Sequence, residues 1–210
     1  MKKDLSCFLL AFALVLCMIR VVKAQDLIPK TEVEMGVSQK VAFIVAPEDF
    51  RDEELFVPKE ALEKAGFKTV IASTRLGKAR GMLGGTVEAE VMISDIKAQD
   101  IQAIVVVGGG GSPKHLWKSE SLHSLLQEMA NSRKLIASIC LSPGALAKAG
   151  VLKGKRATVW KDNLAISELK KGGALYEERP CIVDGSIITA DGPKSAKAFA
   201  DAIISHLSRK

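Results

Sequence analysis

The amino-acid sequence predicts a single α/β domain, a three-layer α/β/α sandwich around a mostly parallel central sheet. Continuous apolar runs of strand length recur at residues 40–45, 101–107 and 135–139, and such runs are typical of strands buried on both faces. Segments with helical spacing of apolar residues lie between these runs. A strand–helix–strand order favours parallel pairing, with helices covering both faces of the sheet.

The composition suits this fold and argues against some functions. Apolar residues make up 48% of the 210-residue chain and aromatic residues only 5%, as expected for a core rich in Ala, Val, Ile and Leu. The net charge is +6, and residues 1–24 alone carry four basic residues against one acid. The other basic residues are scattered without a dense stripe, so we do not expect nucleic-acid binding. No His and Cys residues have zinc-ligand spacing, so we expect no metal and no cofactor.

Residues 1–24 have the features of a secretory signal peptide. Lys2 and Lys3 precede an apolar run over residues 5–19, and small residues at Val22 and Ala24 predict cleavage after Ala24. The protein would then be secreted or periplasmic, with no stable membrane insertion after cleavage. The alternative is an uncleaved leader that anchors the chain in a membrane. Residues 25–38 are predicted to be a polar tether, followed by the domain at residues 39–210.

The first half of the domain predicts three strands, a helix and a hairpin. The strand at residues 40–45 leads into an acidic loop at 46–54, which opens a helix that Gly66 ends. A second strand follows at 68–72. Residues 78–93 alternate around Gly84-Gly85, which predicts a hairpin, and the strand at 101–107 ends in a run of four glycines that begins at Gly108.

The second half continues the alternation of helices and strands. The predicted elements are a helix at 120–131, a strand at 135–139, a helix from Pro143, a short strand at 157–160, a helix at 163–171, strands at 181–183 and 186–190 joined by a turn at Asp184-Gly185, and a closing helix at 194–207.

Cys140 lies between the strand at 135–139 and a helix that starts near Pro143. Pro is favoured in the first turn of a helix, so the cysteine is predicted to sit on a tight strand-to-helix turn, like the nucleophile elbow of α/β hydrolases. Unpaired N–H groups at the start of a helix stabilise an anion, and we therefore expect a lowered pKa for this thiol. The alternative is a small buried cysteine that fills the top of the sheet. Cys140 and Cys181 belong to different elements and are expected to be free thiols.

Three candidate groups follow predicted strands and should meet at the carboxyl edge of the sheet. They are the acidic loop at 46–54, the glycine run from Gly108, and Cys140. Together they predict a pocket with a thiolate, a carboxylate and backbone donors for an oxyanion. A plain turn is the alternative for the glycine run, and a solvated acid at the start of a helix is the alternative for Glu54.

These motifs resemble the DJ-1/PfpI superfamily, which has a flavodoxin-like fold of the class I glutamine amidotransferase type. The matching motifs are the segment from Glu54 to Pro58, the pair Gly108-Gly109, and Ile139-Cys140-x-x-Pro143, and the resemblance covers nearly all of residues 38–208. It implies that Cys140 is the reactive cysteine, that a protonated Glu54 hydrogen-bonds its sulfur, and that Gly108 and Gly109 line the oxyanion site. It also implies a homodimer.

Two positions depart from the family pattern. Leu141 stands where peptidase-like members have a histidine directly after the nucleophile, and Trp160 stands where relatives often have His or Tyr. Neither side chain can act as a base, which disfavours peptide hydrolysis. His115, just beyond the glycine run, is the one histidine expected near the pocket, whereas His123 and His206 are expected on the surface.

Three functions fit this set of residues. The resemblance implies a cysteine-dependent glyoxalase or deglycase that acts on small aldehydes such as methylglyoxal or on their protein adducts. The alternative is a redox-sensing stress protein or chaperone in which Cys140 is oxidised to a sulfinic acid beside Glu54. A cysteine peptidase or amidase is disfavoured because Leu141 replaces the histidine. The expected partners are therefore a small carbonyl compound or a glycated protein, and a second copy of the chain.

Overall fold

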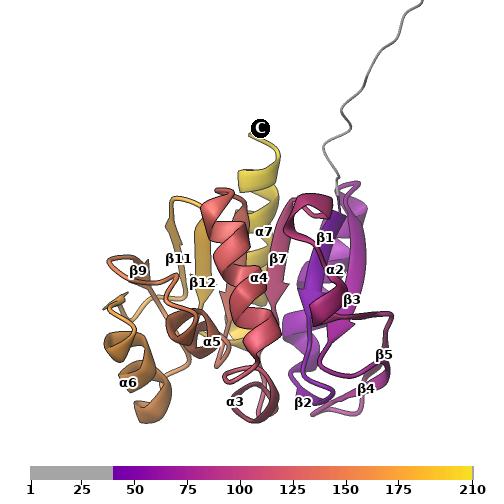
Figure 1. The fold of residues 1–210 in the computed structure, drawn as a ribbon, viewed down its shortest axis with the longest axis horizontal. Helices are drawn as coiled ribbons and strands as arrows, with labels where there is room; N and C mark the ends of the chain where they lie inside the picture. Colours follow the sequence, from indigo (N-terminus) through magenta and orange to yellow (C-terminus); the bar gives the residue numbers. More distant parts are fainter. Residues whose placement is uncertain (1–39, 210) are drawn as a thin grey trace, which may run out of the picture. The chain divides into compact units, whose positions relative to one another are not determined.

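A computed structural model of the chain describes residues 40–209, and the predicted signal peptide and tether lie outside these residues. A seven-stranded sheet forms the centre, in the order β11-β12-β8-β7-β1-β3-β6. Every pairing in it is parallel except that of β11 with β12 (Figure 1). The strands are β1 (Lys40–Ile44), β3 (Lys68–Ser73), β6 (Val91–Met92), β7 (Ala103–Val106), β8 (Leu135–Ile139), β11 (Cys181–Asp184) and β12 (Ile187–Ala190).

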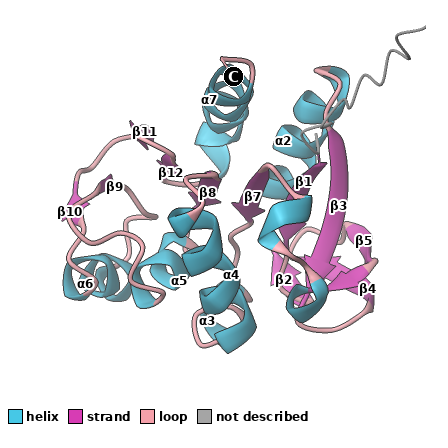
Figure 2. Cartoon of the chain, turned by 45° about the horizontal axis from the view of Figure 1, so that its top comes forward, coloured by secondary structure: helices cyan, strands magenta, loops and turns pink. Residues whose placement is uncertain are grey.

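Helices cover both faces of this sheet, which confirms the predicted three-layer α/β/α fold. The helices α2 (Asp52–Lys64) and α7 (Ala196–Leu207) pack against each other on one face, while α4 (Glu120–Asn131) and α5 (Pro143–Lys148) lie on the other (Figure 2). Side chains of the central strands alternate between two apolar cores. In β7, Ile104 packs into the core under α4, and the next residue, Val105, packs into the core under α2 and α7.

Capping residues explain where several helices begin and end. The Ser119 hydroxyl accepts a hydrogen bond from Leu122 N–H at the start of α4. The Asp162 carboxylate accepts one from Ala165 N–H at the start of α6 (Asn163–Lys171). Gly66 follows the end of α2 with φ of +91°, a conformation that glycine adopts without strain. The bounds predicted for α4 and α6 are those of the structure.

Short elements extend the carboxyl edge of the sheet. The predicted hairpin is present as β4 (Gly77–Gly81) and β5 (Thr86–Ala89), and β2 (Glu48–Phe50) joins β4 in parallel to make a three-stranded sheet. The last part of the predicted hairpin instead forms β6, which pairs in parallel with β3. The acidic loop is therefore partly strand.

The structure corrects one predicted strand and adds a few short helices. The strand predicted at 157–160 is shorter and starts earlier, as β9 (Arg156–Ala157), which pairs with β10 (Leu175–Tyr176). It ends at Ala157 because the backbone N–H of Thr158 donates to the Thr189 hydroxyl and that of Trp160 to the Cys140 carbonyl, instead of to a neighbouring strand. One-turn helices that the sequence pattern did not reveal are α3 (Ser112–His115), η1 (Ile93–Asp95), η2 (Ala98–Asp100) and η3 (Pro193–Ser195).

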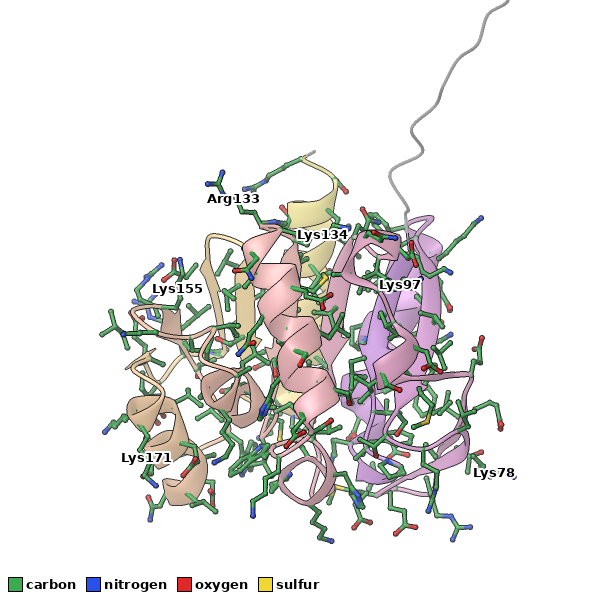
Figure 3. The ribbon with its side chains drawn as sticks, viewed as in Figure 1. Lys78, Lys97, Arg133, Lys134, Lys155 and Lys171 are labelled. Carbon is green, nitrogen blue, oxygen red and sulfur yellow. The ribbon has the colours of Figure 1, made fainter. Side chains whose placement is uncertain are left out.

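Basic side chains are spread around the described part of the chain. The six that are labelled in Figure 3 come from β4, from the segment between η1 and η2, from the turn before β8, from the segment before β9 and from α6. Apart from the neighbours Arg133 and Lys134, they lie at separate places around the ribbon. Between residues 40 and 209, no helix is both long enough and apolar enough to cross a membrane.

Candidate active site

Cys140 occupies a strained turn between β8 and α5. Its φ is +61°, a left-handed conformation that costs a non-glycine residue about 1 kcal/mol or more. Cys140 N–H donates to the Ala190 carbonyl at 2.9 Å, and the Cys140 carbonyl accepts from Trp160 N–H at 3.0 Å. These hydrogen bonds fix the turn at the carboxyl end of the central strand. The thiol is free, only 7% of the residue is exposed, and the residue lines a pocket.

Glu54 faces Cys140 from the first turn of α2 and is fully buried. Gly108, at the end of β7, lies between the two residues. A Cβ atom on Gly108 would collide with the Glu54 carboxyl and would lie 2.5 Å from Cys140 Cβ. Only glycine at position 108 therefore lets the carboxyl and the cysteine approach each other.

Burial controls the charge of Glu54. It raises the pKa of this carboxyl to about 8, and interactions with Cys140, Arg51 and the Gly108 backbone offset only part of the rise. Neither carboxyl oxygen forms a hydrogen bond of normal geometry with another residue in the described part of the chain. Glu54 is thus mostly protonated at neutral pH, and it can donate a proton to a group bound beside the sulfur.

The pKa of the Cys140 thiol is raised, not lowered as the sequence predicted. Burial is the main cause and the Glu54 charge is the second, whereas the Gly109 and Leu141 N–H groups offset part of the rise. The helix that follows has only six residues and contributes less than the loss of solvent. Cys140 and Glu54 titrate as a coupled pair, so the reactive form is the pair that has lost one proton.

The glycine run allows the backbone after β7 to lie against the acidic loop. Gly109 has φ of +107°, and a Cβ there would collide with the Asp49 carbonyl and lie 2.5 Å from Arg51 N. Two hydrogen bonds join the loops: Arg51 N–H donates to the Gly108 carbonyl at 3.0 Å, and Gly111 N–H donates to the Asp49 carbonyl at 3.0 Å. The close approach of Gly109 and Gly111 to the acidic loop thus holds the two loops together beside Cys140.

The pocket above this pair has a volume of about 270 Å³. The structure brings Cys140, Glu54, Gly109, Leu141 and Trp160 together around it, with Gly108 beneath. His115, at the end of α3, is not among the lining residues. Arg51, Met82, Gly110 and Pro193 complete the lining, although no local pattern in the sequence marks them as site residues.

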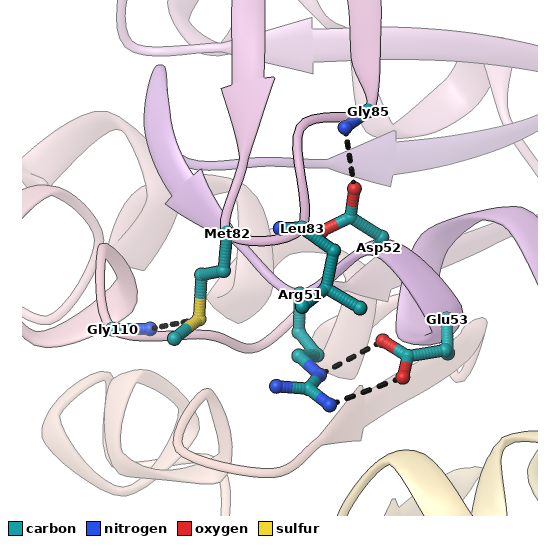
Figure 4. A network of polar contacts seen from close by, with 7 residues as sticks. All are labelled: Arg51, Asp52, Glu53, Met82, Leu83, Gly85 and Gly110. Atoms are coloured by element: carbon teal, nitrogen blue, oxygen red, sulfur yellow. Dashed lines mark hydrogen bonds and ion pairs between the residues drawn. The ribbon is translucent and has the colours of Figure 1, made fainter.

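Met82 reaches the pocket from the tip of the β4–β5 hairpin, which α2 holds in place (Figure 4). The Asp52 carboxylate accepts hydrogen bonds from Leu83 N–H at 2.8 Å and from Gly85 N–H at 2.7 Å. The Met82 sulfur accepts a contact from Gly110 N–H at 3.4 Å. The sequence predicts the hairpin and the acidic start of the helix separately. It does not predict that Asp52 binds the hairpin tip, because that contact depends on the tertiary fold.

Arg51 is the only basic residue in the pocket lining of the described chain, and Glu53 neutralises it. The guanidinium donates to both oxygens of the Glu53 carboxylate, at 2.8 and 3.0 Å (Figure 4). This bidentate pair leaves Arg51 with little attraction for an anionic substrate. The pocket therefore combines one nucleophile, one neutral acid and mainly apolar walls.

Among the described residues, no imidazole lines the pocket that holds the thiol. In residues 40–209, no group of three or more His, Cys, Asp or Glu side chains is arranged to hold a metal ion. The arrangement instead suits addition of the Cys140 sulfur to a carbonyl carbon, with Glu54 as proton donor and the Gly109 and Leu141 N–H groups near the sulfur.

Comparison with known proteins relates the whole domain to one family. The model of the DJ-1/PfpI family matches residues 39–206. A crystal structure of a ThiJ/PfpI domain protein from Brachyspira murdochii superposes with a TM-score of 0.79 and 31% identity, over 83% of this chain and 99% of that chain.

Curated relatives show the same coverage. An uncharacterized protein of Methanocaldococcus jannaschii is 46% identical over 81% of this chain and 83% of its own length. A protein of Thermococcus kodakarensis named a deglycase is 29% identical over 74% and 92%. A Bacillus subtilis relative with a provisional name as a cysteine protease is 30% identical over 78% and 95%.

Proposed function

The chain belongs to the DJ-1/PfpI family, and from this premise we propose that it is a cysteine-dependent hydrolase of the glyoxalase or deglycase type. Its substrates would be 2-oxoaldehydes such as methylglyoxal, or the adducts that they form on proteins. The observation that carries the proposal is the buried, protonated Glu54 that faces Cys140 in a pocket without an imidazole. The deglycase name of a relative supports the same class of reaction.

The reaction begins with the singly ionised Cys140–Glu54 pair, and the proton of the thiol passes to the Glu54 carboxylate as the sulfur attacks. The sulfur attacks the aldehyde carbon, and the electrons of the C=O bond move to the oxygen, which lies near the Gly109 and Leu141 N–H groups. Glu54 then protonates this oxygen and gives a hemithioacetal. The roles of the two residues follow from their charges, because a buried thiolate reacts best beside a neutral acid.

Glu54, now a carboxylate, completes the rearrangement. It removes the hydrogen of the former aldehyde carbon as a proton, which leaves an enediolate, and returns that proton to the neighbouring carbon. The hydroxyl group of the first carbon passes its proton to the oxygen of the second, so the first carbon becomes a thioester carbonyl and the second carries a hydroxyl group. Water then cleaves the thioester, which releases a 2-hydroxy acid and the thiol, so that the net reaction adds one water to the oxoaldehyde.

The test is to incubate the purified protein with methylglyoxal and to measure lactate. We expect turnover that is lost in Cys140→Ser and falls at least a hundredfold in Glu54→Ala. Leu164→Ala, on the exposed surface of α6, is the matched control. Lactate formation that survives in Cys140→Ser would refute the proposal, and so would the absence of turnover of both methylglyoxal and methylglyoxal-treated peptide.

A redox sensor is the second candidate, and the same Glu54 supports it. A neutral carboxyl beside the sulfur can donate a hydrogen bond to a sulfinate, which forms when two molecules of peroxide each transfer one oxygen to Cys140 and leave as water. Mass spectrometry after peroxide treatment tests this candidate. Two added oxygens on Cys140 in a protein without turnover would favour the sensor, and an unmodified Cys140 would exclude it.

The sequence-based predictions of a homodimer and of export by residues 1–24 are also proposals. Sedimentation of the purified protein tests the first. N-terminal sequencing of the protein from its native host tests the second, since cleavage would leave Gln25 as the first residue.

A further inference from the structure

We infer that the pocket selects oxoaldehydes with an apolar substituent, an alkyl or aryl group, and that Met82 and Trp160 are the residues that set this specificity. The inference rests on the proposed function, because it assigns a substrate class to the same Cys140 site. Turnover of methylglyoxal would support the proposed function but not this inference, which requires a preference for substrates with apolar substituents.

The walls of the pocket are apolar and partly open to solvent. Met82 and Trp160 are 48% and 47% exposed, and both line the pocket together with Leu141 and Pro193. An apolar substituent bound between them would remove this surface from water, which is worth about 25 cal/mol per Å². A methyl group, as in methylglyoxal, covers little of it.

The walls of the pocket offer few hydrogen-bond partners. The Arg51 guanidinium pairs with Glu53 through two of its five N–H groups, and Gly110 N–H points to the Met82 sulfur. Cys140 and Glu54 are occupied by the reacting carbonyl. Hydroxyl groups of a sugar-like chain that lie against Met82, Leu141 and Pro193 would therefore lose water without gaining partners.

The walls are held in position before a substrate binds. Asp52 fixes the hairpin tip next to Met82. The backbone N–H of Trp160 donates to the Cys140 carbonyl at 3.0 Å. The indole ring of Trp160 lies so close to Gly192 that a Cβ atom on Gly192 would be 2.6 Å from the ring. Preformed walls improve binding, because less side-chain entropy is lost when the substrate enters.

The size of the pocket agrees with a substituent larger than methyl. Its volume of about 270 Å³ is slightly below the range for drug-sized ligands, about 300–1,000 Å³. A three-carbon dicarbonyl would leave much of this space filled with water.

The experiment compares three substrates by mass spectrometry of the 2-hydroxy acids that they yield. They are methylglyoxal, 4-methyl-2-oxopentanal, which adds an apolar branch, and 3,4-dihydroxy-2-oxobutanal, which adds a polar chain. We expect kcat/KM at least tenfold higher for the branched substrate than for methylglyoxal, since each buried CH₂ is worth about 0.8 kcal/mol. The dihydroxy substrate is expected to fall below methylglyoxal.

Variants locate the preference in the walls. Trp160→Ala and Met82→Ala should each reduce the ratio of branched substrate to methylglyoxal at least threefold, whereas Leu164→Ala, 57% exposed on α6 and outside the pocket, should keep it. Equal or reversed kcat/KM values in the unmodified protein would overturn the inference and leave the proposed function intact. A preference that survives in both wall variants would also overturn the assignment of these two residues.

Absence of turnover would refute the proposed function, and a binding measurement then still tests the inference. The unreactive ketone 4-methyl-2-pentanone is titrated against tryptophan fluorescence, with acetone for comparison. Trp160 is half exposed, while the only other tryptophan, Trp117, is buried and donates to the Leu141 carbonyl. A change with the branched ketone alone, lost in Met82→Ala, which keeps both tryptophans, supports the apolar site. No change, or an equal change with acetone, overturns it.

Discussion

Replacing Glu54 with glutamine should stabilise the protein, and the gain should grow with pH. Burial raises the pKa of Glu54 from 4.5 to about 8. The folded state therefore keeps a proton that the unfolded chain releases above pH 4.5, so ionisation increasingly favours unfolding as the pH rises. Glutamine has nearly the same shape and no charge at any pH, and it avoids this loss.

The magnitude follows from the shift in pKa. Each unit of difference is worth 1.36 kcal/mol, so the loss is near zero at pH 4, about 3 kcal/mol at pH 7 and about 5 kcal/mol above pH 8, where it levels off. Glu54 is fully buried, so solvent does not screen the effect. Glu54→Gln should accordingly unfold at a higher urea concentration than the unmodified protein at pH 7, and at a similar concentration at pH 4.

Urea unfolding followed by fluorescence at pH 4, 5.5, 7 and 8 measures this difference. The matched control is Glu60→Gln on the same helix, an exposed carboxylate paired with Lys64 at 2.7 Å, for which a change within about 0.5 kcal/mol is expected. A difference between Glu54→Gln and the unmodified protein that stays constant from pH 4 to pH 8 would show that the buried acid is not held protonated by the fold.

Three further predictions follow from the site. The kcat/KM for methylglyoxal should rise with pH around an apparent pKa near 8, as the pair loses its first proton, and in Glu54→Gln the rise should move above pH 9, because burial still raises the pKa of the thiol. Gly109→Ala should cost about 2 kcal/mol or more in urea unfolding, because its methyl group would meet the acidic loop, whereas Gly84→Ala, with similar φ and open space, should cost about 1 kcal/mol. Asp52→Ala should free the hairpin tip and raise KM more than it lowers kcat, since the pocket wall would be lost while the Cys140–Glu54 pair stays.

Each of these predictions has a result that contradicts it. A pH profile centred near 6 would indicate a thiol with a lowered pKa, as the sequence alone suggested. Equal losses of stability in the two glycine variants would show that strain in φ, and not the contact with the acidic loop, governs position 109. A fall in kcat with unchanged KM in Asp52→Ala would place the hairpin in the chemical step.

The fold was largely predictable because its signals are local. Apolar runs mark the buried parallel strands, and Ser119 and Asp162 mark the starts of α4 and α6, whose bounds the pattern predicted. The turns at Gly108 and Cys140 were also predictable, because glycines after a strand indicate a turn and Pro143 after Cys140 indicates the start of a helix. The strand β9 was predicted too long because the backbone N–H groups of Thr158 and Trp160 donate to Thr189 and Cys140. These partners are distant in sequence and are brought close only by the tertiary fold.

The electrostatics and walls of the site were not predictable in the same way. The pKa of Cys140 depends on how much solvent the surrounding layers exclude, and the short α5 helix could not reveal that. Met82 and Arg51 enter the pocket through contacts between a hairpin tip, a helix and the glycine loop. His115 is close to the glycine run in sequence, but the α3 turn after the run places it outside the lining.

The first turn of α2 carries three consecutive acids with three different partners. Asp52 binds the hairpin backbone, Glu53 pairs with Arg51, and Glu54 faces Cys140. Successive residues of a helix point about 100° apart, so each acid can serve only the direction in which it projects. Insertion or deletion of one residue just before this turn would rotate each acid away from its own partner, so the spacing from β2 to α2 must tolerate no change in length.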